Sequence, residues 1–244
     1  FSGGSRTIQL GLLTPREVLS GALLFYALAT MIGLYLALIR GPFLFGLGLI
    51  GLFSGFFYTA QPLNWAGKGM GEALVGINFG ALMTLGAYYV QTQVLALEPI
   101  VASIPISLLI AAVLYINEFP DYMADKTVGK NTLVVRLGRS KAVYGYIFMM
   151  LGTYVSIALG YLGGFLPVYT LIGFVTLPLT VKSIKYALQH HSNSFDLAPA
   201  NVATIVCHLL TSLLLSLAYL IGAFGFSNAG YAVLIGAAYS LFTV

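Results

Sequence analysis

Charged residues are scarce in this chain. Of its 244 residues, 11 are Lys or Arg and 7 are Asp or Glu, which together make 7%. A soluble domain carries about 25% charged residues, so this chain has too few to cover a surface that faces water. The composition therefore excludes an ordinary soluble enzyme, a disordered chain and a nucleic-acid-binding protein, although the net charge is +4. Its 59% of hydrophobic residues is typical of an all-α polytopic membrane protein.

Two other features are missing as well. Cys207 is the single cysteine, which excludes an intramolecular disulfide and a cysteine-based metal cluster. The chain starts at Phe1 without the basic stretch and short apolar core that make a signal peptide. We therefore expect the natural chain to begin upstream of Phe1.

Long apolar runs fill most of the chain. A membrane-spanning helix needs about 20 largely apolar residues, and by this criterion we predict eight spans. The 28 glycines fit close helix packing in lipid, because small residues let two backbones approach each other. The predicted spans are Val18–Ile39, Phe43–Thr59, Gly71–Thr92, Pro99–Ile116, Ala142–Leu162, Val168–Leu188, Ala198–Phe224 and Asn228–Thr243.

The connectors between these spans differ in charge. If successive connectors alternate between the two faces of a membrane, ten Lys and Arg residues fall on one face and only Arg40 on the other. An excess of Lys and Arg marks the cytoplasmic face, and six of the seven acids lie on that face too. We therefore expect an integral multi-pass protein whose polar chemistry is cytoplasmic, in the plasma membrane if the source is prokaryotic.

One polar segment directly follows the fourth predicted span. In it Asn117, Asp121 and Asp125 are spaced by four, so on a helix they line one face. Two carboxylates at that spacing repel each other unless a cation lies between them, and Mg²⁺ usually takes one or two carboxylates together with phosphate oxygens. A solvated helix end is the plain alternative, but acids at a membrane edge favour a functional site.

Basic residues follow these acids within fifteen positions. Cations beside a metal-binding acid pair suit a diphosphate group, because they stabilise the negative charge of the departing group. Topology alone explains Arg139 and Lys141, whereas for Lys130 and Arg136 we favour a function.

These residues resemble a known family. The pattern Asn117-x-x-x-Asp121-x-x-x-Asp125, followed by Gly129-Lys130-x-Thr132-Leu133-Val134-Val135-Arg136-Leu137-Gly138, resembles the second aspartate motif of the UbiA superfamily of intramembrane aromatic prenyltransferases. The second part of the pattern favours the branch that prenylates 1,4-dihydroxy-2-naphthoate. Two further stretches, Ser2–Pro15 and Tyr58–Glu72, are similar to the family, so the resemblance covers most of the chain.

The resemblance implies a bundle of nine helices that transfers a polyprenyl group from a polyprenyl diphosphate to an aromatic acceptor, with Mg²⁺ as cofactor. Asp121 and Asp125, together with Asn117, would hold the metal. Lys68 and Lys130 would act on the leaving group. The residues that would contact the diphosphate are Arg6, Tyr58, Lys68, Asn117, Lys130 and Arg136.

The first acidic motif of that family is absent from this chain. Its place would end just upstream of Phe1. We therefore expect a missing first helix and a missing first motif, which leaves eight helices in a single prenyltransferase domain over residues 1–244.

Two alternatives stay open. A relative with another acceptor, such as 4-hydroxybenzoate, a tetrapyrrole precursor or a glycerol phosphate ether, would use the same acids and bases. A cation- or proton-coupled transporter could also place acids in a membrane bundle. Transporters usually show internal repeats, however, and no second copy of Asn117–Gly138 occurs in the sequence.

Overall fold

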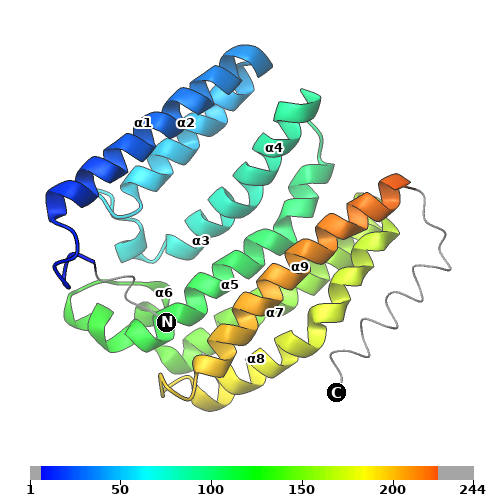
Figure 1. The fold of residues 1–244 in the computed structure, drawn as a ribbon. Helices are drawn as coiled ribbons and strands as arrows, with labels where there is room; N and C mark the ends of the chain where they lie inside the picture. Colours follow the sequence, from blue (N-terminus) through cyan, green and yellow to red (C-terminus); the bar gives the residue numbers. More distant parts are fainter. Residues whose placement is uncertain (1–6, 225–244) are drawn as a thin grey trace.

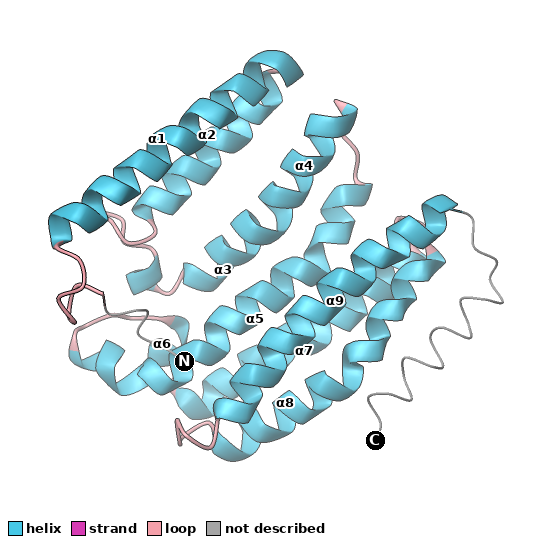
Figure 2. Cartoon of the chain, in the orientation of Figure 1, coloured by secondary structure: helices cyan, strands magenta, loops and turns pink. Residues whose placement is uncertain are grey.

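The computed structural model describes residues 7–224, and the regular structure in that range is helical throughout (Figures 1 and 2). The elements are α1 (Pro15–Arg40), α2 (Pro42–Phe57), the short 3₁₀ turn η1 (Ala66–Lys68), α3 (Gly71–Val75), the π-helical segment η2 (Gly76–Leu82), α4 (Met83–Thr92), α5 (Glu98–Thr127), α6 (Leu133–Leu137), α7 (Arg139–Leu162), the 3₁₀ segment η3 (Val168–Thr176), α8 (Leu177–His190) and α9 (Ala198–Phe224).

Local sequence explains where α1 begins and ends. Thr14 caps the helix by accepting a hydrogen bond from the Glu17 backbone N–H, and the Glu17 carboxylate accepts one from the Thr14 backbone N–H at 2.7 Å. Pro15 fits the first helical position because its missing N–H is not needed there. At the other end Gly41 has a φ of 115°, which L residues rarely adopt, and it turns the chain into α2.

The fold class predicted from the sequence is confirmed. Six helical stretches are long and apolar enough to cross a membrane, and α2 is a shorter apolar helix. Together these correspond to seven of the predicted spans; the eighth, Asn228–Thr243, lies outside the described residues. The span predicted as Pro99–Ile116 continues as one helix to Thr127, so the polar segment after it extends α5 rather than forming a connector.

Helix α5 lies at the centre of the packing. It contacts α7 and α9 on one side and α3 and η2 on the other, while α1 and α2 lie beside each other as a pair (Figure 1). The largest fully buried side chains of α5 are Tyr115, Phe119, Leu109 and Ile116, and all but Leu109 lie near the polar end of the helix. The hydrophobic core therefore supports the helix turns that carry the acidic residues.

Buried hydroxyl groups link α7, α8 and α9. The Tyr146 hydroxyl bonds the Ser183 hydroxyl and lies 2.6 Å from that of Thr204. About two helical turns further along α7, the Tyr154 hydroxyl lies 2.8 Å from the Thr180 hydroxyl. Such bonds between helices are worth about 0.6 to 2 kcal/mol each in a membrane, and they fix how these helices pack.

Candidate active site

The acidic face of α5 continues through a proline. Pro120 lies inside α5 and has no N–H, so the carbonyl of Ile116 loses its usual helical donor. The side chain of Asn201 on α9 replaces that donor, because its Nδ2 lies 3.3 Å from the Ile116 oxygen. A freed carbonyl that a neighbouring helix satisfies lets a helix pass through proline in a membrane. Asn117, Asp121 and Asp125 therefore stay on one continuous helix.

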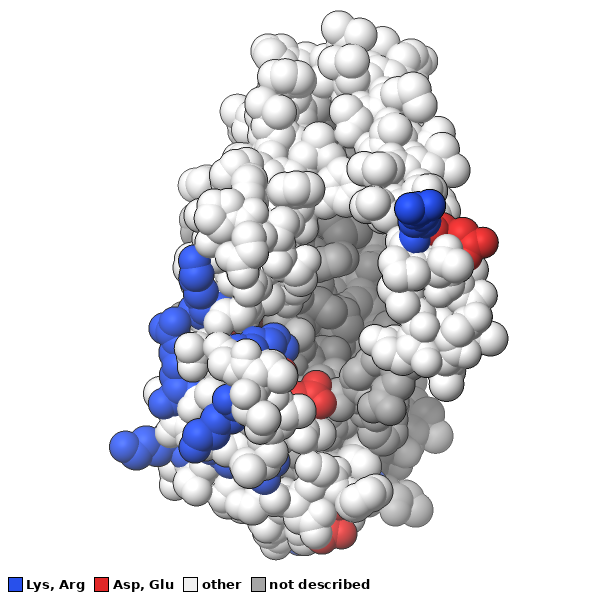
Figure 3. All heavy atoms as spheres, turned by 90° about the vertical axis from the view of Figure 1, so that its left-hand side faces the viewer, with Lys and Arg blue, Asp and Glu red and all other residues white. Residues whose placement is uncertain are grey.

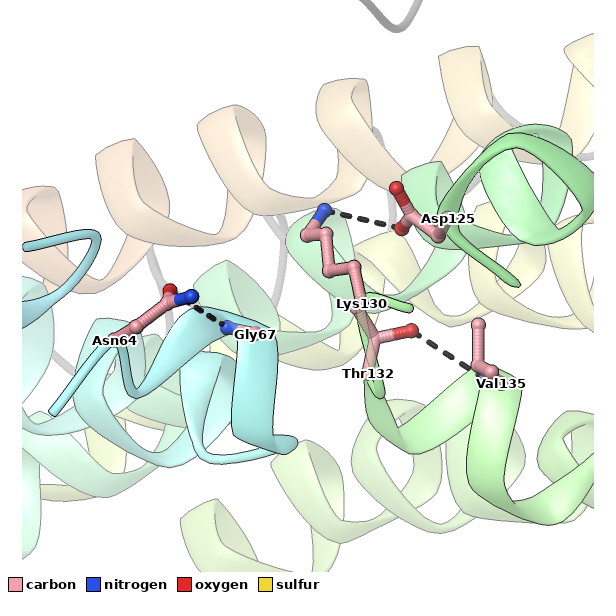
Figure 4. Close-up of polar contacts among 6 residues, drawn as sticks. All are labelled: Asn64, Gly67, Asp125, Lys130, Thr132 and Val135. Atoms are coloured by element: carbon pink, nitrogen blue, oxygen red, sulfur yellow. Dashed lines mark hydrogen bonds and ion pairs between the residues drawn. The ribbon is translucent and has the colours of Figure 1, made fainter. Parts of the chain in front are cut away.

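Asp125 and Lys130 form the ion pair of the candidate site. Asp125 is buried, and its Oδ2 lies 3.0 Å from the Nζ of Lys130 (Figure 4). The turn after α5 sets this geometry, since the Lys130 backbone N–H donates to the Asp125 carbonyl at 2.9 Å and Gly129 takes a φ of 73°. Both residues belong to the metal–diphosphate site predicted from the sequence, and the roles assigned to them there stay a prediction.

Asp121 is placed differently from Asp125. It is half-buried, and within residues 7–224 its carboxylate makes no hydrogen bond or ion pair. An unpaired carboxylate one helical turn from a paired one is free to bind a cation.

Two connectors distant in sequence meet next to this pair. The backbone N–H of Asn131 donates to the carbonyl of Gly67 at 2.9 Å. Arg136 Nε donates to the carbonyl of Asn131 at 3.1 Å. Gly69 has a φ of 67°, and a Cβ there would lie 3.1 Å from the Asn131 oxygen and 3.2 Å from Arg136 Nε. Only glycine suits this backbone conformation and this close approach, so Gly69 allows the two connectors to dock.

The other predicted diphosphate contacts are less closely grouped. Lys68 is exposed, and its Nζ donates to the Pro62 carbonyl in its own connector at 3.0 Å. A hydrogen bond from the Gly67 backbone N–H to Asn64 Oδ1 shapes the same connector (Figure 4). Arg6 lies outside the described residues.

Tyr58 lies at the end of α2, beside two acids. It is half-buried, and burial raises the pKa of its phenol above the ordinary value, with Glu118 and Glu72 raising it further. The phenol therefore keeps its proton near neutral pH, and it can donate a hydrogen bond.

Glu72 and Glu118 lie near each other, which the sequence analysis did not predict. Glu72 on α3 is 2% exposed and Glu118 on α5 is 7% exposed. The two carboxyl groups interact electrostatically, and Glu118 also interacts with Thr132 and Lys130. Within the described part of the chain, neither Glu72 oxygen reaches a hydrogen-bond partner. Glu72 follows soon after the connector that carries Lys68, and Glu118 lies on the same helix as Asp121 and Asp125.

Asp121 and Asp125 can supply only some of the ligands that a metal ion needs. No group of three or more His, Cys, Asp or Glu side chains that could hold a metal occurs among residues 7–224. Asp121 and Asp125 nevertheless share one helix face, and carboxylate oxygens are the donors that Mg²⁺ prefers, usually alongside phosphate oxygens. The described residues therefore fit one side of a magnesium–diphosphate site.

The charged side chains are distributed unevenly over the molecule. Figure 3 shows most of the Lys and Arg side chains of the face in view gathered on one side, with a separate basic group beside acidic atoms on the other side. The connectors that meet at the candidate site contribute Lys68, Lys130 and Arg136. The division of charge between the two membrane faces stays a prediction.

Fold and site together define a multi-pass membrane protein with acidic and basic groups assembled at one end of a helical bundle. A sequence profile described as the UbiA prenyltransferase family matches residues 4–198, and the chain belongs to that family. The predicted family and the predicted enzyme class, a prenyltransferase, are both confirmed.

Individual relatives agree with this assignment. The 1,4-dihydroxy-2-naphthoate octaprenyltransferase of Bacillus subtilis is 28% identical, over 86% of this chain and 67% of its own length. The protein of the same name from Haemophilus influenzae is 32% identical, over 90% and 73%. The UbiA prenyltransferase domain-containing protein 1 of Rattus norvegicus is 29% identical, over 89% and 62%. This chain thus spans roughly two thirds of each relative. No solved structure matches it.

Proposed function

We propose that this protein transfers a polyprenyl group from a polyprenyl diphosphate to 1,4-dihydroxy-2-naphthoate. The observation that carries the proposal is the buried Asp125 paired with Lys130 on the acidic face of α5, one helical turn from the unpaired Asp121. The names of the bacterial relatives support the choice of a naphthoate acceptor.

Asp121 and Asp125 are the proposed metal ligands, with Asn117 beside them on the same face. Mg²⁺ at this position would supply positive charge that neutralises the oxygens of the diphosphate. Oxygens of the diphosphate would supply further ligands.

The basic residues are proposed to bind the diphosphate as it leaves. Lys130 already lies at the acidic face, and Arg136 and Lys68 extend from the two docked connectors. When the C–O bond to the diphosphate breaks, these cations stabilise the negative charge that develops on the leaving oxygen. A ring carbon of the acceptor then forms the new C–C bond to the allylic carbon, and the ring regains its aromaticity when that carbon loses the group it carried, either a proton or, if it bore the carboxylate, carbon dioxide. We propose that this occurs at the cytoplasmic face, where Lys and Arg are concentrated.

Turnover by the full-length protein tests the proposal. The purified protein is given labelled prenyl diphosphate and Mg²⁺ with a panel of acceptors: the naphthoate, 4-hydroxybenzoate, a tetrapyrrole precursor and a glycerol phosphate ether. We expect a prenylated naphthoate, and its mass shows whether the acceptor carboxylate is lost. Prenylation of a different acceptor in preference to the naphthoate would overturn the naphthoate assignment, and no product with any acceptor would overturn the proposed reaction.

A further inference from the structure

The amide of Asn201 has a determined orientation. Asn201 lies on α9 and is 1% exposed, and its Nδ2 is within 3.3 Å of the Ile116 carbonyl and 2.6 Å of Asn117 Oδ1. Both of these neighbours are hydrogen-bond acceptors. Turning the Asn201 amide over would place its oxygen against the Ile116 carbonyl, which offers no proton. The carbonyl that Pro120 leaves free therefore holds the nitrogen of Asn201 toward α5.

This orientation in turn sets the amide of Asn117. A primary amide has an oxygen that accepts and a nitrogen that donates, on opposite branches of the same carbon. Because Asn201 presents a donor, Asn117 must turn its oxygen toward α9 and into the buried interface between the helices.

The nitrogen of Asn117 is left available. Within residues 7–224 its Nδ2 makes no hydrogen bond, and it is not among the fully buried polar atoms without a partner. Asn117 itself is half-buried, on the helix face that also carries Asp121 and Asp125. The group that this residue can offer to a ligand is therefore an N–H donor.

We propose that Asn117 contacts the diphosphate through its N–H group rather than the metal through its oxygen, and that Asn201 is the positioning residue that sets this choice. The inference rests on the proposed function and assigns a role within it. An N–H donor matches the oxygens of a diphosphate, which only accept, and the oxygen of Asn117 is already bonded by the amide of Asn201.

Binding measurements on the full chain separate the two roles of Asn117. Farnesyl thiodiphosphate, a slowly reacting analogue, is titrated into the protein with Mg²⁺, and Mn²⁺ is titrated separately without the analogue. Asn117→Asp keeps an acceptor for Asn201 but removes the donor. We expect the Kd for the thiodiphosphate to rise about tenfold or more, as befits a lost hydrogen bond to a charged group, while Mn²⁺ binding is not weakened. Thiodiphosphate binding as tight as in the wild type would overturn the inference.

A change at Asn201 tests the positioning role. Asn201→Asp removes the donor, so Asn117 must turn its nitrogen toward α9 to keep the bond. We expect a similar loss of thiodiphosphate affinity with Mn²⁺ binding retained, and a double variant no weaker than Asn117→Asp alone, because both changes act through one amide. Loss of Mn²⁺ binding equal to the loss of thiodiphosphate binding would show that Asn201 supports a metal ligand instead. Asn117→Asp needs no repacking of α9, so it remains decisive if the Asn201 variant does not fold.

Two comparisons complete the experiment. Asn193→Asp makes the same chemical change in the exposed connector before α9 and should leave both affinities unchanged. A wild-type protein that binds no thiodiphosphate would defeat the proposed function itself. A wild-type protein that binds it, with both Asn117→Asp and Asn201→Asp binding it equally well, would defeat only the assignment of Asn117 and Asn201.

Discussion

Helices α1 and α5 are both long and apolar enough to cross a membrane, but their surroundings differ. Of the most apolar stretch of α1, 6% is buried, against 44% of that of α5. Among the described residues α1 packs mainly against α2, whereas α5 packs against α3, η2, α7 and α9. The helix that carries the acids is thus the one that the rest of the bundle encloses.

The hydrogen bonds of polar side chains also differ between α1 and the helices around α5. In α1 the Thr30 hydroxyl donates to the Tyr26 carbonyl of its own helix. Around α5, by contrast, Asn201 bonds Asn117 and Ile116 from another helix, and the hydroxyl of Tyr146 links α7 to α8 and α9. Groups that must be positioned within fractions of an ångström need such support, so we expect activity and stability to depend far more on the α5 bundle than on the α1–α2 pair.

We expect the largest difference in activity between α5 and α1 when their acidic residues are substituted. Asp121→Ala and Asp125→Ala are each expected to abolish Mg²⁺-dependent prenyl transfer, because each removes a proposed metal ligand. Glu17→Gln, an acid-to-amide change in the exposed first turn of α1, should keep wild-type transfer. Transfer is measured with labelled prenyl diphosphate on folded, membrane-inserted protein, and full activity in either alanine variant would remove the metal assignment.

A smaller effect is expected for the cation of the ion pair. Lys130→Ala should lower kcat on the order of a hundredfold, as for other groups that stabilise developing negative charge, with less effect on the acceptor KM. Lys182→Ala, an exposed lysine of α8, provides the comparison and should leave kcat unchanged. Unchanged kcat with a raised acceptor KM in Lys130→Ala would contradict a role in diphosphate departure.

Glycine substitutions probe packing rather than chemistry. A Cβ at Gly80 would lie 1.9 Å from the Ser107 hydroxyl and 2.7 Å from the Ser107 Cα, so Gly80→Ala must push η2 away from α5. Overpacking of this kind costs about 1 to 3 kcal/mol. At Gly46 on α2 a Cβ would meet nothing within 4 Å. Thermal unfolding in detergent should therefore show a lower Tm for Gly80→Ala and not for Gly46→Ala; equal Tm values would contradict the close contact.

The smallest expected effect concerns one hydroxyl group. Tyr146→Phe removes a buried hydroxyl that bonds Ser183 and Thr204, and should lower the free energy of unfolding by about 1 kcal/mol. Those two partners still bond each other at 3.0 Å, which limits the loss. Tyr35→Phe in α1, where the side chain is 62% exposed, should change nothing. Denaturation of both variants in the same detergent compares α7 with α1. Equal losses in the free energy of unfolding would contradict the expected difference between these helices.

The sequence predicts local features of this protein well. Apolar runs mark seven described spans, and a spacing of four places Asn117, Asp121 and Asp125 on one face because helix geometry repeats over that interval. The pairing of Asp125 with Lys130 is also local, since one turn of chain brings them together.

Contacts between helices are not predicted in the same way. Asn201 lies 84 positions from Asn117, and periodicity tells which face a residue occupies but not which helix covers it. Pro120 signals that a carbonyl needs a new donor, and an asparagine in the apolar run of α9 signals that a donor exists. Neither pattern says that the two meet, because that depends on the packing of the whole bundle. The meeting of Glu72 with Glu118 was missed for the same reason.

The bond between Asn131 and Gly67 is made by main-chain atoms alone. The side chain at position 131 can therefore change during evolution without loosening the junction, provided that no proline replaces the donor there. Position 67 is less tolerant, because a Cβ there would lie 2.7 Å from Asn64 Nδ2. Relatives with other side chains at position 131 would in this way keep the same spacing between the basic residues on each side of the junction.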